Sequence, residues 1–287
     1  MPGWIGGALV CGALLLLHPP AARAQFVRRL FEPTDTEMEA PGMAELDLQF
    51  GPVRGEDEPR FSLPDFEFDL GLIPHLELDI DGEYAIGGGS NASLFALNGP
   101  SPDNLWIALK VDATAQKLQW NSAAGVKELT FTEAVQFGPK LPVAPGAIGF
   151  GFQGLVLLGL EAPFPRLLDG DEDTASFVLN LGGLVDPSED VGSPPPAGIV
   201  TGLDVDLPIA NDWTFNVGLA AAAYFSPDPT QFDTSVGLTY TAYEAERCAW
   251  FCSLDISLTG VYGWLQGGDQ YGVLLGLSPK FRLWDTD

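Results

Sequence analysis

The residues best suited to carry chemistry are acidic ones that alternate with apolar ones. Between Phe66 and Leu72 every second residue is apolar, and Glu67 and Asp69 stand between them. Successive side chains of a strand point to opposite faces, so this pattern gathers carboxylates on one face of a sheet. The carboxylates predicted to share such a face are Glu67, Asp69, Glu77, Asp79, Asp81, Glu83, Asp204, Asp206 and Asp255. Around an open passage they would attract cations and repel anions. In a narrow interior they would instead form a hydrated, partly paired filling.

The sequence offers little for acid–base or nucleophilic catalysis. His75 is the only histidine after residue 24, and its position directly after Pro74 indicates a turn. Neither a G-x-S-x-G nor an H-E-x-x-H motif occurs. The acidic run 169–173 offers oxygens to calcium but lacks the distal glutamate of an EF-hand loop, so we interpret it as a solvated loop. We therefore predict no enzymatic activity, no metal site and no cofactor.

The first 24 residues have the layout of a secretory signal peptide. Residues 5–17 form an apolar run apart from glycines and one cysteine, and the triplet 22–24 reads Ala-Arg-Ala, an A-x-A cleavage site. The run is shorter than the roughly 20 apolar residues that a transmembrane helix needs. An exported chain meets an oxidising compartment, so Cys248 and Cys252 are predicted to form a disulfide rather than a zinc site.

The elements that must position the acidic residues are strands. Alternation with a period of two recurs from residue 44 onward, and helical periodicity does not. About twelve strands are expected, over 44–51, 61–72, 75–86, 103–113, 126–138, 147–161, 174–185, 198–208, 212–225, 231–245, 251–265 and 270–284. Many exceed the five or six residues of an ordinary strand, and spans near ten suit a tilted membrane strand.

The connections between these strands also alternate in length. Short ones occur at 73–75 and 209–212, and longer loops occur at 87–102 and 186–197. Short turns at one end and long loops at the other are typical of outer-membrane barrels. The segment 162–173 departs from this rule, because it is long and falls at the end where turns should be short.

Two architectures fit the alternation, and they differ in what the apolar face meets. In a secreted β-sandwich the apolar rows face a core and the acidic rows face water, whereas in a membrane barrel the apolar rows face lipid and the acidic rows line the lumen. Long strands favour the barrel. So does the placement of Trp213 and Phe215 at the start of a strand and of Tyr262 and Trp264 at the end of another, where interfacial aromatic residues belong. We therefore predict an all-β fold, an antiparallel up-and-down transmembrane β-barrel of about twelve strands.

Two strand–short turn–strand segments carry a resemblance to a known group of proteins. Residues 69–79 (DLGLIPHLELD) and 203–218 (LDVDLPIANDWTFNVG) resemble Gram-negative outer-membrane β-barrels. The rhythm over residues 60–284 is similar to the barrel family associated with phenol meta-cleavage pathways, whose members are described as transporters. The resemblance implies insertion into outer-membrane lipid by the barrel-assembly machinery, and passive transport. It divides the chain into a signal peptide (1–24), an N-terminal periplasmic tail (25–43) and an outer-membrane barrel (44–287).

Composition narrows the function further. Thirteen basic residues against 39 acidic ones give a net charge of −26, which excludes a nucleic-acid partner because phosphate binding requires a basic surface. The expected function is a passive channel or uptake pore for small solutes, porin-like, with a cation-favouring lumen. Two alternatives stay open: a structural or surface-binding barrel that transports nothing, and a secreted β-sandwich that binds a partner.

Overall fold

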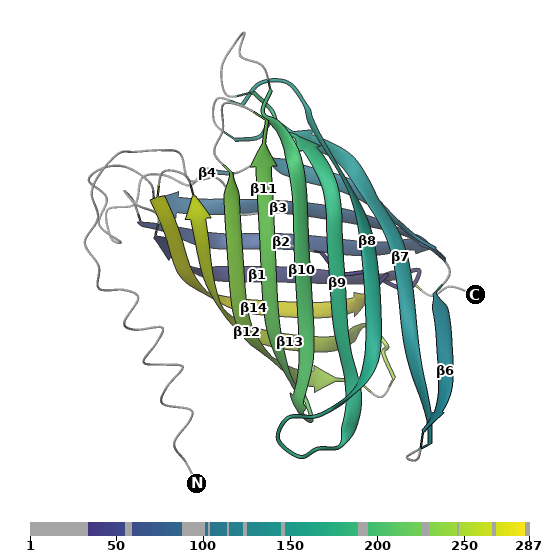
Figure 1. The fold of residues 1–287 in the computed structure, drawn as a ribbon. Helices are drawn as coiled ribbons and strands as arrows, with labels where there is room; N and C mark the ends of the chain where they lie inside the picture. Colours follow the sequence, from purple (N-terminus) through teal and green to yellow (C-terminus); the bar gives the residue numbers. More distant parts are fainter. Residues whose placement is uncertain are drawn as a thin grey trace.

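The computed structural model describes residues 34–54, 59–87, 101–102, 104–113, 115–122, 125–144, 147–188, 195–225, 230–245, 247–265 and 268–284, so the predicted signal peptide lies outside the described residues. The described part is built of strands (Figure 1). They are β1 (Met43–Arg54), β2 (Pro59–Ile73), β3 (Leu76–Gly87), β4 (Ser101–Pro102), β5 (Leu105–Asp112), β6 (Gln116–Ser122), β7 (Gly125–Leu141), β8 (Gly151–Pro165), β9 (Glu172–Val185), β10 (Ala197–Ala210), β11 (Trp213–Tyr224), β12 (Gln231–Glu244), β13 (Phe251–Leu265) and β14 (Gly268–Arg282).

The strands close into an antiparallel barrel. Twelve of them pair in the cyclic order β1-β2-β3-β5-β7-β8-β9-β10-β11-β12-β13-β14, and β14 pairs with β1 to complete the ring. The pairings between consecutive strands are antiparallel, and the closing pair runs from Met43 opposite Arg282 to Arg54 opposite Tyr271. Closure pairs each of these twelve strands with a neighbour on both sides, as a sheet in lipid requires. The predicted barrel of about twelve strands is therefore confirmed.

Two short strands lie off the ring. The two-residue β4 pairs with β3, and β6 pairs with the first part of β7. Because β5 and β6 pair with successive parts of β7, β6 and β7 form a hairpin that extends past the ring (Figure 1). Strand β6 was not predicted from the sequence, because residues 116–122 are mostly polar and contain only two apolar residues, Leu118 and Trp120.

The two ends of the barrel differ in their connections. At the terminal end, where β1 begins and β14 ends, the strands join through 74–75, 166–171, 211–212 and 245–250. At the opposite end, the loop end, the connections include 142–150, 186–196 and 225–230. The expected long connection over 162–173 is shorter than predicted, because β8 continues to Pro165 and β9 begins at Glu172.

The outer face of the ring is apolar and exposed. Val156 pairs with Val135 on one side and Leu181 on the other, and all three side chains are exposed. Phe137, Phe152 and Leu158 continue this surface on the same strands. Rows of exposed apolar side chains around a closed sheet suit contact with hydrocarbon rather than with water. The described residues include no helix long and apolar enough to cross a membrane.

The inner face is divided into an acidic and an apolar side. The acidic wall consists of the inward carboxylates of β1, β2 and β3, namely Glu45, Asp47, Asp65, Glu67, Asp69, Glu77, Asp79, Asp81 and Glu83. The apolar wall is a cluster of buried side chains on β5 and β7–β11, namely Trp106, Ala108, Ala134, Leu155, Leu157, Leu184, Val200 and Ala222. Tyr224 packs against that cluster.

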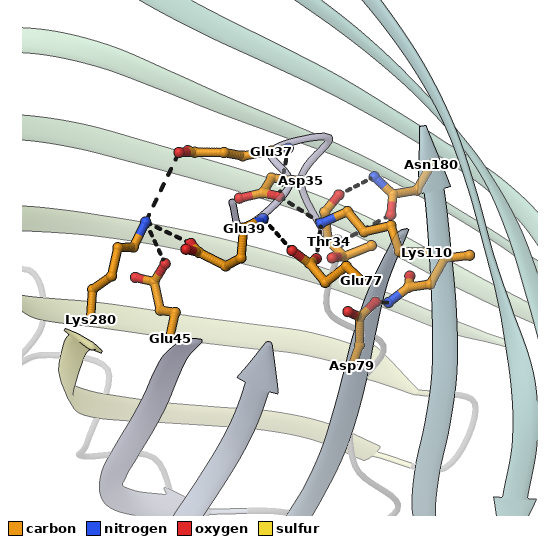
Figure 2. A network of polar contacts seen from close by, with 11 residues as sticks. Thr34, Asp35, Glu37, Glu39, Glu45, Glu77, Asp79, Lys110, Asn180 and Lys280 are labelled. Atoms are coloured by element: carbon orange, nitrogen blue, oxygen red, sulfur yellow. Dashed lines mark hydrogen bonds and ion pairs between the residues drawn. The ribbon is translucent and has the colours of Figure 1, made fainter. Parts of the chain in front are cut away.

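A segment ahead of β1 occupies the interior. We call residues 34–42 the strap, because they run from the start of β1 into the barrel and contact several of its strands from inside (Figure 2). These residues belong to the stretch predicted as a tail, of which 25–33 lies outside the described residues. The strap is the feature of the fold that the sequence analysis did not anticipate.

Candidate functional site

The nine carboxylates singled out from the sequence fall on the inner face of the barrel. Glu67 and Asp69 on β2 pair with Asp81 and Asp79 on β3. Asp204 and Asp206 on β10 lie two and four residues after Gly202, so they face the same side of the sheet as Gly202. Gly202 pairs with Asn180, whose side chain points inward. Asp255 on β13 pairs with Ser278, which is in phase with the inward Lys280. Pairing partners share a face, so strand register alone places these carboxylates on the inner face.

Lys110, on the neighbouring β5, forms an ion pair with the acidic wall. Glu77 and Lys110 are register partners, and their Oε1 and Nζ atoms lie 3.1 Å apart. Next to them, Gln136 donates from Nε2 to Asp79 Oδ2 at 2.6 Å. Like charges directly opposite in a sheet repel, so Lys110 and Gln136 stabilise a face that would otherwise be purely anionic.

A group of three carboxylates in this wall has the spacing of a cation site. Asp69, Glu77 and Asp79 each bring an oxygen within 4.8 Å of the other two. Hard cations prefer such oxygen ligands. The Lys110 ammonium already lies against Glu77, so the arrangement is explained as a lysine-compensated cluster.

The strap is fixed to this wall and to the wall across from it. Asp35 Oδ1 lies 3.1 Å from Lys110 Nζ, and the Glu39 amide donates to Glu77 Oε2 (Figure 2). On the far side, Asn180 makes a pair of hydrogen bonds with the Thr34 backbone. It accepts from the Thr34 amide at 3.0 Å and donates to the Thr34 carbonyl at 2.9 Å. An amide side chain that satisfies one backbone unit in this way fixes its position like a strand neighbour.

A second lysine holds the middle of the strap. Lys280 on β14 places Nζ 2.7 Å from Glu39, 3.0 Å from Glu45 and 4.0 Å from Glu37 (Figure 2). One cation thus joins two strap carboxylates to the first strand of the barrel. Lys110 and Lys280 together allow an acidic segment to rest on an acidic wall.

Two glycines, on β2 and β8, make room for the strap. A β-carbon at Gly71 on β2 would clash with the Glu39 and Ala40 carbonyl oxygens, and the Gly71 carbonyl accepts from the Gly42 amide at 2.8 Å. A β-carbon at Gly159 on β8 would meet Thr36 well inside van der Waals contact, with Thr36 Cγ2 at 3.1 Å. The wall is therefore shaped to the backbone of the strap, because any larger residue would fill its path.

The strap crosses the full width of the lumen. It starts at β1 and reaches Asn180 on β9, and β9 stands six places from β1 in either direction around the twelve-strand ring. Strands six places apart in a ring of twelve lie diametrically opposite. The strap consequently divides the interior, and anything that moves through the barrel must pass beside it.

The charges on the strap itself face the remaining space. The side chains of Asp35 and Glu37 stay largely exposed although they lie inside the ring. The pKa of Glu37 is raised, first because the surrounding wall partly removes its carboxyl from bulk water, and second because Asp35 adds a like charge.

The remaining candidates from the sequence have structural explanations. His75 lies in the tight turn between β2 and β3 with a φ of 67°, and its Nδ1 is 2.6 Å from Asp112. In the acidic run 169–173, Asp169 and Asp171 pair with Arg166 at 2.9 and 2.8 Å. At the terminal end a disulfide joins Cys248, in the connection after β12, to Cys252 near the start of β13.

Several partners of the site carry no signal in the sequence. Lys280 and Asn180 are polar residues on strands that carry other polar residues as well, so nothing distinguishes them in the sequence. Thr34 to Glu39 belong to a mixed, proline-interrupted stretch. Gly71 and Gly159 stand at inward positions of their strands, which is the pattern by which a close approach of backbone could have been suspected.

This protein is similar to known proteins in its structure but not in its sequence. No protein-family model matches the chain, and no curated protein matches it in sequence. Among solved structures it is similar to the COG4313 outer membrane channel from Pseudomonas putida F1, with a TM-score of 0.51, 10% identity, and coverage of 88% of this chain and 99% of that one. It is also similar to the translocator domain of the autotransporter NalP from Neisseria meningitidis, with a TM-score of 0.41, 8% identity, and coverage of 85% and 90%.

These likenesses do not test the narrower resemblance to barrels of phenol meta-cleavage pathways, which stays a prediction. At 10% identity, the first likeness speaks for architecture rather than for activity. Together with the closed antiparallel ring and its exposed apolar surface, it shows that this chain has the fold of a Gram-negative outer-membrane β-barrel.

Proposed function

We propose that this protein is an outer-membrane barrel that acts as a passive, cation-favouring channel for small solutes. In this proposal the predicted signal peptide directs export, the barrel-assembly machinery inserts the chain, and the apolar outer face contacts lipid. The small solutes pass through the barrel interior. No cofactor or catalytic group takes part.

The observation that carries the proposal is the reversed polarity of the barrel. Exposed apolar rows cover the outside, and an excess of carboxylates faces inward against Lys110 and Lys280. A barrel filled only for stability has no need of inward charges that repel one another. Charges of one sign around a water-filled passage attract the opposite ion, which is how charged pores select.

The test is conductance of the refolded barrel in a planar bilayer. We expect stepwise channels, and under a potassium chloride gradient a reversal potential of the sign that cation preference gives. Folding is checked beforehand by gel mobility in SDS with and without boiling, because a closed barrel resists unfolding in the cold detergent. A correctly folded barrel that gives no channels would refute the proposal.

One observation favours a second candidate, a closed barrel that transports nothing. The strap crosses the lumen from β1 to β9, and the buried apolar wall narrows the space beside it. Twelve strands lie between the eight that side chains fill and the sixteen or more that leave an aqueous channel. The same bilayer experiment separates the two, since the closed barrel would remain silent after folding.

A further inference from the structure

Three carboxylates of the wall and two of the strap differ most in how much water they meet. On the wall, Glu77 and Asp79 are 1% exposed and Glu83 is 2% exposed. On the strap, the side chains of Asp35 and Glu37 are 59% and 76% exposed. A solute inside the barrel would therefore meet Asp35 and Glu37 directly, and these three wall carboxylates only through other protein atoms. The half-buried wall carboxylates Glu67, Asp69 and Asp81 are intermediate between the two groups.

The buried wall carboxylates also have close partners of their own. Glu77 pairs with Lys110, Asp79 accepts from Gln136, and Glu83 accepts from Ser62 at 2.5 Å. Glu37 stands 4.0 Å from Lys280, a lysine that lies closer to both Glu39 and Glu45. The field of a carboxylate is weakened by a cation in contact with it, so the exposed end of Glu37 keeps more of its negative potential. Asp35 lies 3.1 Å from Lys110, so its contribution rests on the exposure of its side chain to the lumen instead.

We infer that the strap, rather than the barrel wall, sets the ion preference of the channel, with Asp35 and Glu37 as its selectivity-determining residues. The inference rests on the proposed channel function and names the part of the lumen that performs it. Because the strap spans the diameter, no ion path avoids its neighbourhood.

The strap is held firmly enough to present these charges at fixed places. Asn180 fixes the backbone one residue before Asp35, and Lys280 with Glu77 fixes Glu39, two residues after Glu37. Gly159 receives Thr36 between the two carboxylates. A selectivity element requires such positioning, since a freely moving segment would average its charge over the whole lumen.

The experiment compares two double variants that remove the same charges. Asp35→Asn with Glu37→Gln removes the two exposed charges of the strap and leaves Glu39 in place. Asp173→Asn with Glu244→Gln neutralises two exposed residues at the terminal rim as the matched control. The readout is the potassium-to-chloride permeability ratio from the reversal potential. If the variant loses about one kT of local potential, cation partition falls and anion partition rises by a factor of about 2.7 each. The permeability ratio of the strap variant should therefore fall about sevenfold. The rim variant should keep the wild-type ratio.

A third variant, Asp79→Asn, asks whether the wall contributes instead. If channels form and the strap variant keeps the wild-type ratio, the inference is overturned, and a fall in the Asp79→Asn variant would assign selectivity to the wall. If no variant and no wild-type protein conducts after correct folding, the channel function itself fails, and the inference fails with it. Conduction with an unchanged ratio and absence of conduction are separate results, so the two failures can be told apart.

Discussion

Replacing Gly159 by alanine should loosen the strap without unfolding the barrel. The added methyl carbon would overlap Thr36 Oγ1 and stand 3.1 Å from Thr36 Cγ2 and 3.2 Å from Thr36 Cβ. All three atoms belong to the Thr36 side chain, which is short and β-branched and therefore has little freedom to move away. The strap backbone must consequently shift to relieve the overlap. Overpacking of this kind costs about 1–3 kcal/mol. A cost of about 2 kcal/mol would shift the balance between docked and undocked strap about 30-fold towards the undocked state.

A spin label on the strap measures this shift. Met38→Cys provides a reporter site within the strap, and the native Cys248 and Cys252 are bonded to each other and do not react. We expect the label spectrum to gain a mobile component in Gly159→Ala. The matched control is Gly154→Ala on the same strand, where the added carbon would meet nothing closer than 3.7 Å. An immobile spectrum in Gly159→Ala, equal to that of the control, would refute the placement of the strap against β8.

Two further variants test the other attachments of the strap. Asn180→Leu removes both hydrogen bonds to the Thr34 backbone, each of which contributes about 1 kcal/mol. We expect the spectrum of the Met38→Cys label to gain the same mobile component, while the gel shift of the barrel stays unchanged. An unchanged label spectrum would contradict the attachment. Lys280→Met leaves Glu39 and Glu45 without their shared cation, and we expect the free energy of unfolding in urea to fall by about 1–3 kcal/mol, as for other partly buried charges that lose a partner. Lys280→Arg keeps the charge and should restore most of that loss, whereas equal stability of all three proteins would show that the lysine is not engaged.

The barrel itself was predictable because its two faces obey a simple rule. In β2, Phe66, Phe68 and Leu70 alternate with Glu67 and Asp69, and the observed register puts these two sets on opposite faces. The alternation survives in the sequence because lipid and lumen impose opposite demands on neighbouring residues. Strand ends were less accurate, as at the turn after Pro165, because proline and aromatic residues there fit both a strand and a loop.

The composition of the acidic wall was predictable, but its partners were not. Period-two alternation assigns Glu77 and Asp79 to one face, and an up-and-down barrel places the next strand beside β3, yet neither gives the register between the two strands. Lys110 and Gln136 reach these carboxylates only through the pairing of β3 with β5 and of β5 with β7. Contacts of this kind depend on the register between neighbouring strands, which alternation within one strand does not encode.

The strap was hidden for a different reason. Residues 34–42 have no periodicity, because they form no strand or helix, and their acidic character suggests a solvated tail when they are considered alone. Their position inside the barrel depends on the wall, which supplies Lys110, Lys280 and two inward glycines on β2 and β8. An acidic segment is stable on an acidic wall only while those two lysines bridge them. The lysines that neutralise the wall are therefore also those that hold the strap, so substituting either lysine should change both the stability of the barrel and the occupancy of its lumen.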